Sequence, residues 1–510
     1  MSRAPADAGG APLENRTLLV VAIMLATLMQ VIDTTIANVA LPNMQGSLSA
    51  SQEQIAWVLT SYIVAAAIAT PTTGWLATVL GRKNLLLLAI GGFTLASVLC
   101  ATAVNVGQIV AYRVLQGLFG AALIPMSQSS LLDAFPQEKH GSAMAMWGMG
   151  LMVGPILGPP LGGWLTEHYS WHWVFLINIP VGILALLGVA AAVPAGEHHK
   201  RRFDLLGFLL VAVGIGALQL MLDRGEHNAW FGSTETWIEA VLAGLGLYLY
   251  WVHWREKRHP FVNLGLLRDR NYAAANVFIF VLGIVLFATL ALLPPYLGTL
   301  MQYPVVDIGM LMMPRGLGTM VSMIVVGRLL GRGIDARLPV LAGLLLTAWS
   351  LHMMAYFTAD MPAEPIIWSG VVQGLGVGLV FVPISTIAYS TLAPAERTEA
   401  AAMYSLTRNI GSSVGISIVM TLLVRGTQVN HAEIAARVTA YGYGSLPSPW
   451  NPGSSEGLAA LNAEVSRQAA AIGYVNDFWL MMWMVLATLP LLLMFKPPAR
   501  AAGARRALAA

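Results

Sequence analysis

The feature that most constrains this chain is a series of apolar runs of about 20 residues, each almost free of charge. Two of them lie at 85–104 and 173–193. A helix rises about 1.5 Å per residue, so such a run matches the roughly 30 Å hydrocarbon core of a bilayer. Backbone amides and carbonyls find no partner in lipid, so each run is expected to be a helix. We therefore expect an all-α polytopic membrane protein.

The remaining composition excludes several classes of protein. A soluble domain carries roughly 25% charged residues, whereas this 510-residue chain carries 10%. Its net charge of +3 is too small to indicate binding to nucleic acid. The sequence has no P-loop Gly-Lys-Ser/Thr for ATP, and a single Cys100 with ten scattered histidines indicates no metal site. We expect no enzyme activity, no cofactor and no metal.

Breaks at glycines, prolines and charge clusters divide the sequence into fourteen predicted spans. They are expected near 17–40, 54–77, 84–104, 107–132, 143–166, 172–194, 204–222, 234–254, 272–298, 306–330, 338–358, 364–391, 401–424 and 477–495. Lysine and arginine favour short cytoplasmic loops, and an N-terminus inside collects most of them in alternate loops. An even number of spans then places both the N and C termini in the cytoplasm.

An internal repeat indicates how the spans are grouped. The fourth span carries Gln116-Gly117-Leu118 and then Pro125, and the twelfth carries Gln373-Gly374-Leu375 and then Pro383. Parallel repeats of this kind are typical of transporters that work by alternating access. We expect two pseudo-symmetric six-helix bundles with two extra central helices. The expected division is a cytoplasmic tail at 1–16, an N-terminal bundle at 17–194, two linker spans with their loops at 195–270, a C-terminal bundle at 271–496 and a cytoplasmic tail at 497–510.

One predicted outside loop, 425–476, is much longer than the others. It holds a Gly/Pro/Ser-rich stretch at 441–455 and then a helix-compatible run at 457–472. Long loops are often functional. The segment is therefore either a periplasmic cap or linker, or a docking site for a partner.

Asp33 is the only carboxylate well inside a predicted span, where a charge is costly and usually faces a cavity or a partner. It lies about 24 Å from the inner end of the first span, and Arg113 lies about 9 Å from the outer end of the fourth. The two groups are thus expected at a similar depth, where a pair would depend strongly on protonation. We predict that Asp33 carries protons and that Arg113 tunes it; the alternative is a structural ion pair.

Arg315 and Arg408 lie in predicted spans that offer no carboxylate partner. They either snorkel to the membrane surfaces or line a cavity. If they line a cavity, three arginines face one aspartate, and weak acids or neutral lipophiles are preferred over dications. The candidate cavity residues are Gln30, Thr34, Asn38, Gln116, Met149, Arg315, Gln373 and Arg408.

Two glycine-rich segments are candidates for moving parts. The fifth span concentrates small residues and prolines, which either bend the helix as an access hinge or simply allow tight packing. These residues are Gly150, Gly154, Pro155, Gly158, Gly162 and Gly163. The basic turn from Gly74 through Gly81 to Arg82 and Lys83 is either a cytoplasmic gate or a plain membrane anchor.

Taken together, these motifs resemble the fourteen-span drug/proton antiporters of the major facilitator superfamily, of the EmrB type. The resemblance covers nearly the whole chain, and its sharpest motifs lie in the first half. They are 29–42 around Asp33, 74–83, 113–117, the antiporter-like motif 154–163, 171–182 and 222–225. The loop after the second span departs from the family by carrying Thr78 in place of an aspartate, which puts a charge-relay latch there in doubt.

The resemblance implies a major facilitator fold in the bacterial inner membrane and proton-driven efflux of small lipophilic or amphipathic toxic compounds and drugs. It also implies a periplasmic adaptor protein and an outer-membrane channel as partners, and proton coupling at Asp33 and Arg113. An alternative within transport is a dedicated exporter of one lipophilic acid or metabolite. An alternative of a different class is a membrane receptor or scaffold that transports nothing.

Overall fold

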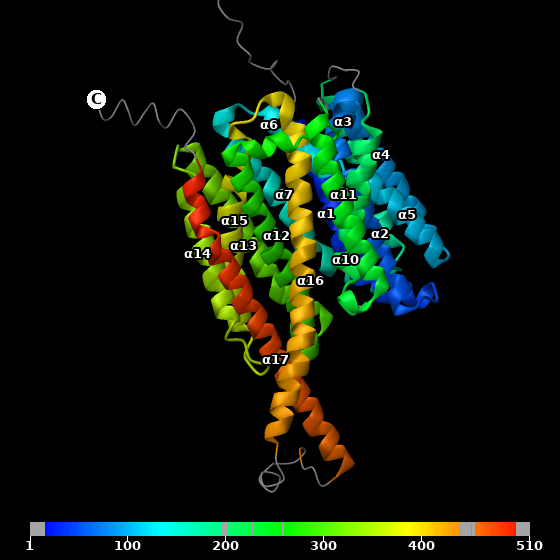
Figure 1. Ribbon diagram of the computed structural model, residues 1–510, viewed down its shortest axis with the longest axis vertical. Coiled ribbons are helices and arrows are strands. Elements are labelled where there is room, and N and C mark those ends of the chain that lie inside the picture. Colours follow the sequence, from blue (N-terminus) through cyan, green and yellow to red (C-terminus); the bar gives the residue numbers. More distant parts are fainter. Residues whose placement is uncertain are drawn as a thin grey trace, which may run out of the picture. The chain divides into compact units, whose positions relative to one another are not determined.

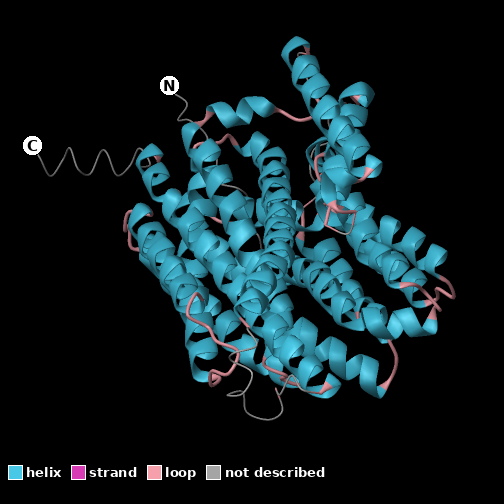
Figure 2. Cartoon of the chain, turned by 60° about the horizontal axis from the view of Figure 1, so that its bottom comes forward, coloured by secondary structure: helices cyan, strands magenta, loops and turns pink. Residues whose placement is uncertain are grey.

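The computed structural model describes residues 16–194, 202–226, 228–257, 260–438, 450 and 454–495. Within these ranges the ordered elements are helices, and no strand occurs (Figure 2). The tails expected before residue 16 and after residue 496 lie outside the described residues. So does the centre of the expected outside loop, at 439–449 and 451–453.

The chain forms two compact units. Unit 1 comprises Met1–Phe208, Lys257–Asn263 and Leu392–Ser405, and unit 2 comprises Leu209–Glu256, Leu264–Thr391 and Leu406–Ala510. The domain limits expected from the sequence stay a prediction.

Unit 1 contains the first nine α-helices (Figure 1). They are α1 (Arg16–Ser47), α2 (Gln52–Ala69), α3 (Thr72–Leu80), α4 (Arg82–Ala101), α5 (Val106–Gly120), α6 (Leu123–Ala134), α7 (His140–His168), α8 (Trp173–Leu176) and α9 (Asn178–Ala192). Helix α1 packs against α6, α7 and α9, so its residues form the centre of the unit. Its buried face is mostly apolar, with Ile23, Met29 and Ile36 among the fully enclosed side chains.

Unit 2 contains the later helices. They are α10 (Leu205–Arg224, from Leu209 onward), α11 (Thr234–Glu256), α12 (Arg270–Pro295), the π-helical turn η4 (Tyr296–Leu300), α13 (Val305–Gly331), α14 (Arg337–Met354), α15 (Glu364–Ser390), α16 (Arg397–Arg437, from Leu406 onward), α17 (Ser455–Ala487) and the 3₁₀ turn η7 (Leu489–Met494). Helix α15 packs against α12, α13 and α14. Glycines such as Gly343, Gly374 and Gly376 allow this because a side chain there would meet the neighbouring backbone.

Two of the predicted spans differ from the helices of the structure. One is the bent pair α2–α3, and the other is α11, which is less apolar. Among the residues that the structure describes, twelve helical segments are long and apolar enough to cross a membrane, and the bent pair α2–α3 makes thirteen if it is one span. That pair turns by 60° next to Pro71, which has no amide hydrogen to continue the helix. Helix α11 has 23 residues but is not among these segments, and it carries the charged residues Glu235, Glu239, Arg255 and Glu256. The count of fourteen spans therefore stays a prediction.

The segment expected as a long outside loop, 425–476, is largely helical. Helix α16 continues to Arg437 and α17 begins at Ser455, so the two extend beyond α12–α15 as a hairpin (Figure 1). Gly426 lies against Gly473, and Asn430 Nδ2 donates to the Ala469 carbonyl over 3.2 Å. The prediction placed the last span at 477–495 because hydropathy is low before it, but the helix itself starts 22 residues earlier.

Candidate functional site

Asp33 is fully buried at the centre of unit 1 and accepts hydrogen bonds from three side chains. Arg113 Nη1 on α5 donates to Oδ2 over 2.6 Å. Gln116 Nε2, one turn further along α5, donates to Oδ1 over 2.7 Å, and Asn178 Nδ2 on α9 donates to the same oxygen over 2.8 Å. Ser97 Oγ on α4 accepts from both amides, over 2.7 and 3.1 Å. Four helices thus meet at one carboxylate.

Arg113 is enclosed as completely as its partner. Its Nε donates to the Val58 carbonyl of α2 over 2.9 Å, and its Nη1 also donates to Gln116 Oε1 over 2.6 Å. The guanidinium carbon lies 4.3 Å from the centre of the Tyr62 ring and 5.7 Å from that of Phe175, where ring faces stabilise a cation. A buried ion pair is tolerated only when most of its remaining donors and acceptors are satisfied, and here Nε and Nη1 of Arg113 and both oxygens of Asp33 form hydrogen bonds.

This geometry makes protonation of Asp33 a structural event. The carboxylate of Asp33 accepts hydrogen bonds from Arg113, Gln116 and Asn178, whereas a protonated carboxyl group would have a hydrogen of its own to place. Protonation would also leave Arg113 as a buried cation without its counter-ion, which is costly in a medium of low dielectric constant. The hydrogen bonds of the Asp33 carboxylate and the enclosure of the Arg113 cation therefore depend on each other.

Two members of this network, Ser97 and Asn178, are missing from the site expected from the sequence. Asn178 does carry a signal, because an amide inside the apolar run 173–193 needs a partner in the membrane. Ser97 gives no comparable signal, since a serine can satisfy itself on its own helix, and here its hydroxyl also donates to the Phe93 carbonyl.

Among the described residues, no hydrogen bond joins the other cavity candidates of unit 1 to the Asp33 carboxylate. Gln30 is buried one turn before it on α1, and the hydroxyl of Thr34 donates to the Val31 carbonyl over 2.9 Å. Asn38 is exposed further along the same helix, and Met149 is half-buried on α7. Their role in a substrate cavity stays a prediction.

The structure places Arg315 and Arg408 among the buried residues of unit 2, with 6% and 8% of their surface exposed. Arg315 Nη2 on α13 donates to the Leu286 carbonyl of α12 over 3.2 Å. Gln373 Nε2 on α15 donates to Thr289 Oγ1, one turn further along α12, over 3.1 Å. Within the described part of the chain, Arg315 Nη1 and Gln373 Oε1 have no hydrogen-bond partner.

These residues occupy the repeat positions of the Asp33 site. A shift of 256 or 257 residues takes Asp33 to Thr289, Gln116 to Gln373, Arg113 to Gly370 and Val58 to Arg315. Gly370 leaves room beside Arg315, whose Cβ lies 3.5 Å from where a Cβ of residue 370 would stand. Unit 2 thus has the amide of Gln373 at the position of Gln116 and the hydroxyl of Thr289 at that of the Asp33 carboxylate. Its arginine, Arg315, comes from a helix that does not correspond to α5.

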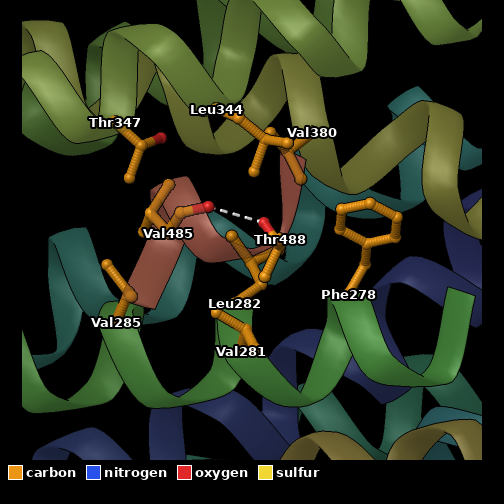
Figure 3. A pocket seen from close by; sticks show the side chains of 9 residues that line it. All are labelled: Phe278, Val281, Leu282, Val285, Leu344, Thr347, Val380, Val485 and Thr488. Carbon is orange, nitrogen blue, oxygen red and sulfur yellow. Dashed lines mark hydrogen bonds between the residues drawn. The ribbon is translucent and has the colours of Figure 1, made fainter. Parts of the chain in front are cut away.

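A small apolar pocket lies on another face of α12 in unit 2 (Figure 3). The hydrogen bond drawn there runs from Thr488 Oγ1, just after the end of α17, to the Val485 carbonyl over 2.7 Å. The lining side chains are Phe278, Val281, Leu282, Val285, Leu344, Thr347, Val380, Val485 and Thr488. Nothing charged lines it, so it offers shape and apolar surface alone.

The glycines of the fifth span form a stripe on α7 that faces α1. A side chain at Gly150 would meet Met24, one at Gly154 would meet Val31, and one at Gly158 would meet Thr35. Gly162 likewise approaches the Ile36 backbone, whereas a side chain at Gly163 would meet nothing within 4 Å. Helix α7 stays continuous through Pro155, Pro159 and Pro160. Tight packing on α1 is therefore present, and the hinge role stays a prediction.

The basic turn 74–83 is held by acidic partners that the sequence does not reveal. Gly81 joins α3 to α4 with a φ of 77°, a conformation that favours glycine. Arg82 pairs with Asp133 at the end of α6, and Arg397 Nη1 pairs with the same carboxylate over 3.0 Å. Gly74 lies against Glu399, so a larger residue would displace it.

Two further contacts complete this cluster in unit 1. Lys83 Nζ donates to the Ala190 carbonyl over 2.7 Å, and Glu399 accepts from the Asn263 amide over 2.8 Å. Thr78, which departs from the family pattern, donates to the Gly74 carbonyl over 2.9 Å. Asp133 supplies a carboxylate to Arg82 despite that departure. Whether the cluster acts as a gate stays a prediction.

No group of three or more metal-ligating side chains occurs among the residues that the structure describes. The chemistry of the Asp33 site is therefore that of a titratable carboxyl group, a fixed cation and neutral hydrogen-bonding groups.

Comparison with known proteins agrees with this geometry. Residues 23–416 match the sequence model of the Major Facilitator Superfamily. The chain is 35% identical over 508 residues to the fatty acid resistance protein FarB of Neisseria gonorrhoeae, covering 96% of this chain and 99% of FarB. It is 33% identical over 511 residues to the multidrug export protein EmrB of Escherichia coli K12, covering 96% and 98%.

A solved structure with a similar fold is that of the human organic anion transporter MFSD10 (TETRAN). It superposes with a TM-score of 0.60 at 14% identity, over 92% of this chain and 99% of that one. A likeness at that identity shows the fold alone. The resemblance to the EmrB type and the helical major facilitator fold, both expected from the sequence, are confirmed.

Replacing Gly158 by leucine should force α7 away from α1, because its side chain collides with Thr35. Overpacking of this kind costs about 1–3 kcal/mol, and the same movement disturbs the helix that carries Asp33. We expect a lower unfolding temperature of the purified protein and weaker export. Gly163→Leu on the same helix is the matched control, and equal losses in both variants would contradict the packing argument.

Proposed function

Because this chain belongs to the major facilitator superfamily, we propose that it exports small lipophilic or amphipathic compounds in exchange for protons, by alternating access. It is a transporter and not an enzyme, and it is a multi-pass protein of the bacterial inner membrane. The observation that carries the proton part of the proposal is the Asp33 network, in which one buried carboxylate gathers donors from α5 and α9.

In this proposal, Asp33 takes up a proton from the outside and releases it to the inside. Binding of the proton breaks the balance with Arg113, so α1 and α5 favour a different arrangement in each protonation state. The glycine stripe couples α7 to any movement of α1. The cluster of Arg82, Asp133 and Arg397 stabilises one arrangement of the helix ends through ion pairs that must break in the other.

The proposed topology has fourteen spans and cytoplasmic termini, with α11 counted as a span. At about 1.5 Å per residue its 23 residues are long enough to cross the hydrocarbon core. Large apolar side chains on its surface, including Trp237, Val241 and Leu245, are exposed, as a face toward lipid requires.

Asp33→Asn should abolish proton movement driven by substrate, because an amide cannot exchange a proton at this position. It also leaves Arg113 without its counter-ion, at a cost of about 3–5 kcal/mol in stability. The double variant Asp33→Asn with Arg113→Gln removes both charges, so we expect it to regain much of that stability while staying uncoupled. Internal pH of proteoliposomes on addition of substrate, together with unfolding temperatures, measures both.

Substrate-evoked proton movement that is unchanged in both variants would exclude Asp33 as the carrier. Its absence in the wild-type protein, for every compound of a toxic-compound panel, would remove the antiport proposal and favour a receptor or scaffold.

For the substrate, we propose that lipophilic weak acids are included. Arg315 is a buried cation whose Nη1 is unpartnered within the described residues, and Gln373 Oε1 on the neighbouring helix is likewise unpartnered. The carboxylate of a bound substrate would neutralise the charge of Arg315. The relative FarB, which is 35% identical to this chain, is named for fatty acid resistance. The same observation favours, as the second candidate, an exporter dedicated to one lipophilic acid. Measuring export of a panel of lipophilic acids and unrelated drugs distinguishes the two proposals, because an exporter dedicated to one acid would transport only that acid.

Arg315→Gln should weaken export of a lipophilic acid much more than export of a neutral lipophile. A hydrogen bond to a charged group contributes about 1.5–3 kcal/mol, which corresponds to a tenfold or larger rise in KM. A long-chain acid and the matching alcohol, measured in the same vesicles, provide the comparison. Arg315→Lys, which keeps the charge, is the control. An equal loss for both compounds, or better export of dications, would exclude anion recognition at Arg315.

We also propose that the exporter works with a periplasmic adaptor and an outer-membrane channel, through the hairpin of α16 and α17. The helices of the hairpin continue well beyond α12–α15 (Figure 1). On it, the apolar side chains of Val429 and Leu458 are 57% and 51% exposed. Exposed apolar side chains on such a projection suit a helical partner.

Val429→Glu and Leu458→Glu should lower drug tolerance of cells that have an outer membrane, because a charge on an apolar contact opposes docking. Exchange of substrate for protons by the same variants in proteoliposomes should stay at the wild-type rate, since both side chains are already exposed. Gln428→Glu, an exposed polar position beside Val429, is the control. Unchanged tolerance in the first two variants would exclude docking at this face.

A further inference from the structure

Helix α17 contains another almost fully buried carboxyl group, Asp477, of which 1% is exposed. The sequence places this residue at the outer boundary of the last predicted span, where an acidic side chain needs no explanation. The structure places it inside a continuous helix. Arg467, ten residues earlier, pairs with Asp360 in the connection between α14 and α15. Asp477 lies about 15 Å further along the axis.

The surroundings of Asp477 are aromatic and apolar. Tyr474 and Phe478 are its buried neighbours on α17. The Tyr474 ring lies 5.2 Å from that of Tyr296 on η4, and the Phe478 ring lies 6.0 Å from that of Phe357. In the described part of the chain, Asp477 Oδ2 has no hydrogen-bond partner, and no basic side chain forms an ion pair with the carboxyl group.

The titratable groups on the elements around α17 are engaged elsewhere. His352 on α14 packs edge-to-face on Trp479, and Arg425 on α16 is exposed. Arg467 on α17 is shared between Asp360 and Glu464. Tyr296 on η4 and Tyr474 on α17 are neutral phenols. The pocket around Asp477 thus supplies no cation.

Asp33 and Asp477 therefore occupy opposite environments. Asp33 accepts three hydrogen bonds, one of them from a guanidinium, and its charged form is stabilised. A carboxylate at Asp477 would be buried without compensation, which is far more costly than burial of the neutral acid. The described conformation suits a protonated Asp477.

The pocket also lies where the regular α-helical geometry of α12 ends. Helix α12 ends at Pro294 and Pro295 and continues as the π-helical turn η4, and such turns frequently mark functional sites. Tyr296 begins this turn and is fully buried, with a hydroxyl group that has no partner among the described residues. A shift of η4 would admit water to the aromatic pocket and make release of the proton favourable.

We propose that Asp477 is a second proton-binding site, located in unit 2, that holds a proton in the described conformation and releases it to water when η4 moves. The proton leaves Asp477 Oδ2 for water, the carboxylate remains, and a proton from the opposite side later restores the neutral acid. The contribution of this proton to export rests on the proposed function, whereas its presence on Asp477 does not.

The direct test is infrared spectroscopy of the purified full-length protein in lipid nanodiscs at neutral pH, which separates protonated carboxyl groups from carboxylates. We expect an absorption of a protonated carboxyl group in the wild type that is lost in Asp477→Asn and retained, with a shifted frequency, in Asp477→Glu. Asp360→Asn is the matched control. Hydrogen bonds from Arg467 and its positive charge hold the pKa of Asp360 below its ordinary value, so Asp360 is ionised.

The second measurement is the steady-state substrate gradient that proteoliposomes reach under an imposed pH difference. Each coupled proton adds about a factor of ten to this gradient per pH unit. We expect the limiting gradient of Asp477→Asn to fall by about tenfold per pH unit, with Asp360→Asn unchanged.

An infrared absorption that is the same in the wild type and Asp477→Asn would overturn the proposal, and an unchanged gradient would overturn its coupling to export. If Asp477→Asn does not fold, Asp477→Glu decides, because the shift of its absorption identifies the residue. A wild-type protein without any proton exchange would refute the proposed function and leave the infrared result standing.

Discussion

The structure depends on the ion pair between Asp33 and Arg113, because it encloses two charged side chains that are 0% and 1% exposed. The pair is tolerable only if every donor and acceptor around it is satisfied, and α1, α2, α4, α5 and α9 each supply a group for that purpose. Glycines on α7 let α1 lie at the centre of this arrangement. Packing and electrostatics thus impose the same constraint, which is that α1 must be held closely on all sides.

The two repeats divide the charges unequally. The repeat position of Asp33 is Thr289. Among the described residues, Arg315 of unit 2 forms no ion pair with a carboxylate, and Gln373 retains an unpartnered oxygen. The acid of unit 2, Asp477, lies instead on α17, in an aromatic pocket. The two repeats thus share an arrangement of helices but differ in their charged groups. In unit 1, Asp33 and Arg113 form an ion pair, whereas in unit 2 the cation Arg315 and the acid Asp477 lie apart.

The sequence predicts the framework well because apolar length and glycine spacing act locally. Asp33 and Arg113 could be predicted to pair from their similar depth in the membrane, since the ends of both spans are clear in the sequence. The partners Ser97, Asn178 and Asp133 could not, because they come from helices distant in the sequence and only folding brings them together. The burial of Asp477 could not be predicted for another reason. Hydropathy measures where the apolar run begins, but α17 starts 22 residues before Asp477, so a residue assigned to a span boundary is in fact enclosed.

The charge carried by the substrate determines how much energy is available for its export. Moving one charge across the membrane potential is worth about 2.3 kcal/mol per 100 mV, and one proton entering contributes this amount in addition to the pH difference. An exported anion contributes the same amount again, since it leaves an interior that is negative, whereas a neutral lipophile contributes none. A weak acid also returns through the bilayer in its neutral form, so a pump for such acids works against a continuous leak. Recognition of the anion by a cation such as Arg315 would select the form whose export the potential assists, and a second proton at Asp477 would raise the attainable gradient further. The separated charges of unit 2 are therefore suited to the substrates that are hardest to keep out.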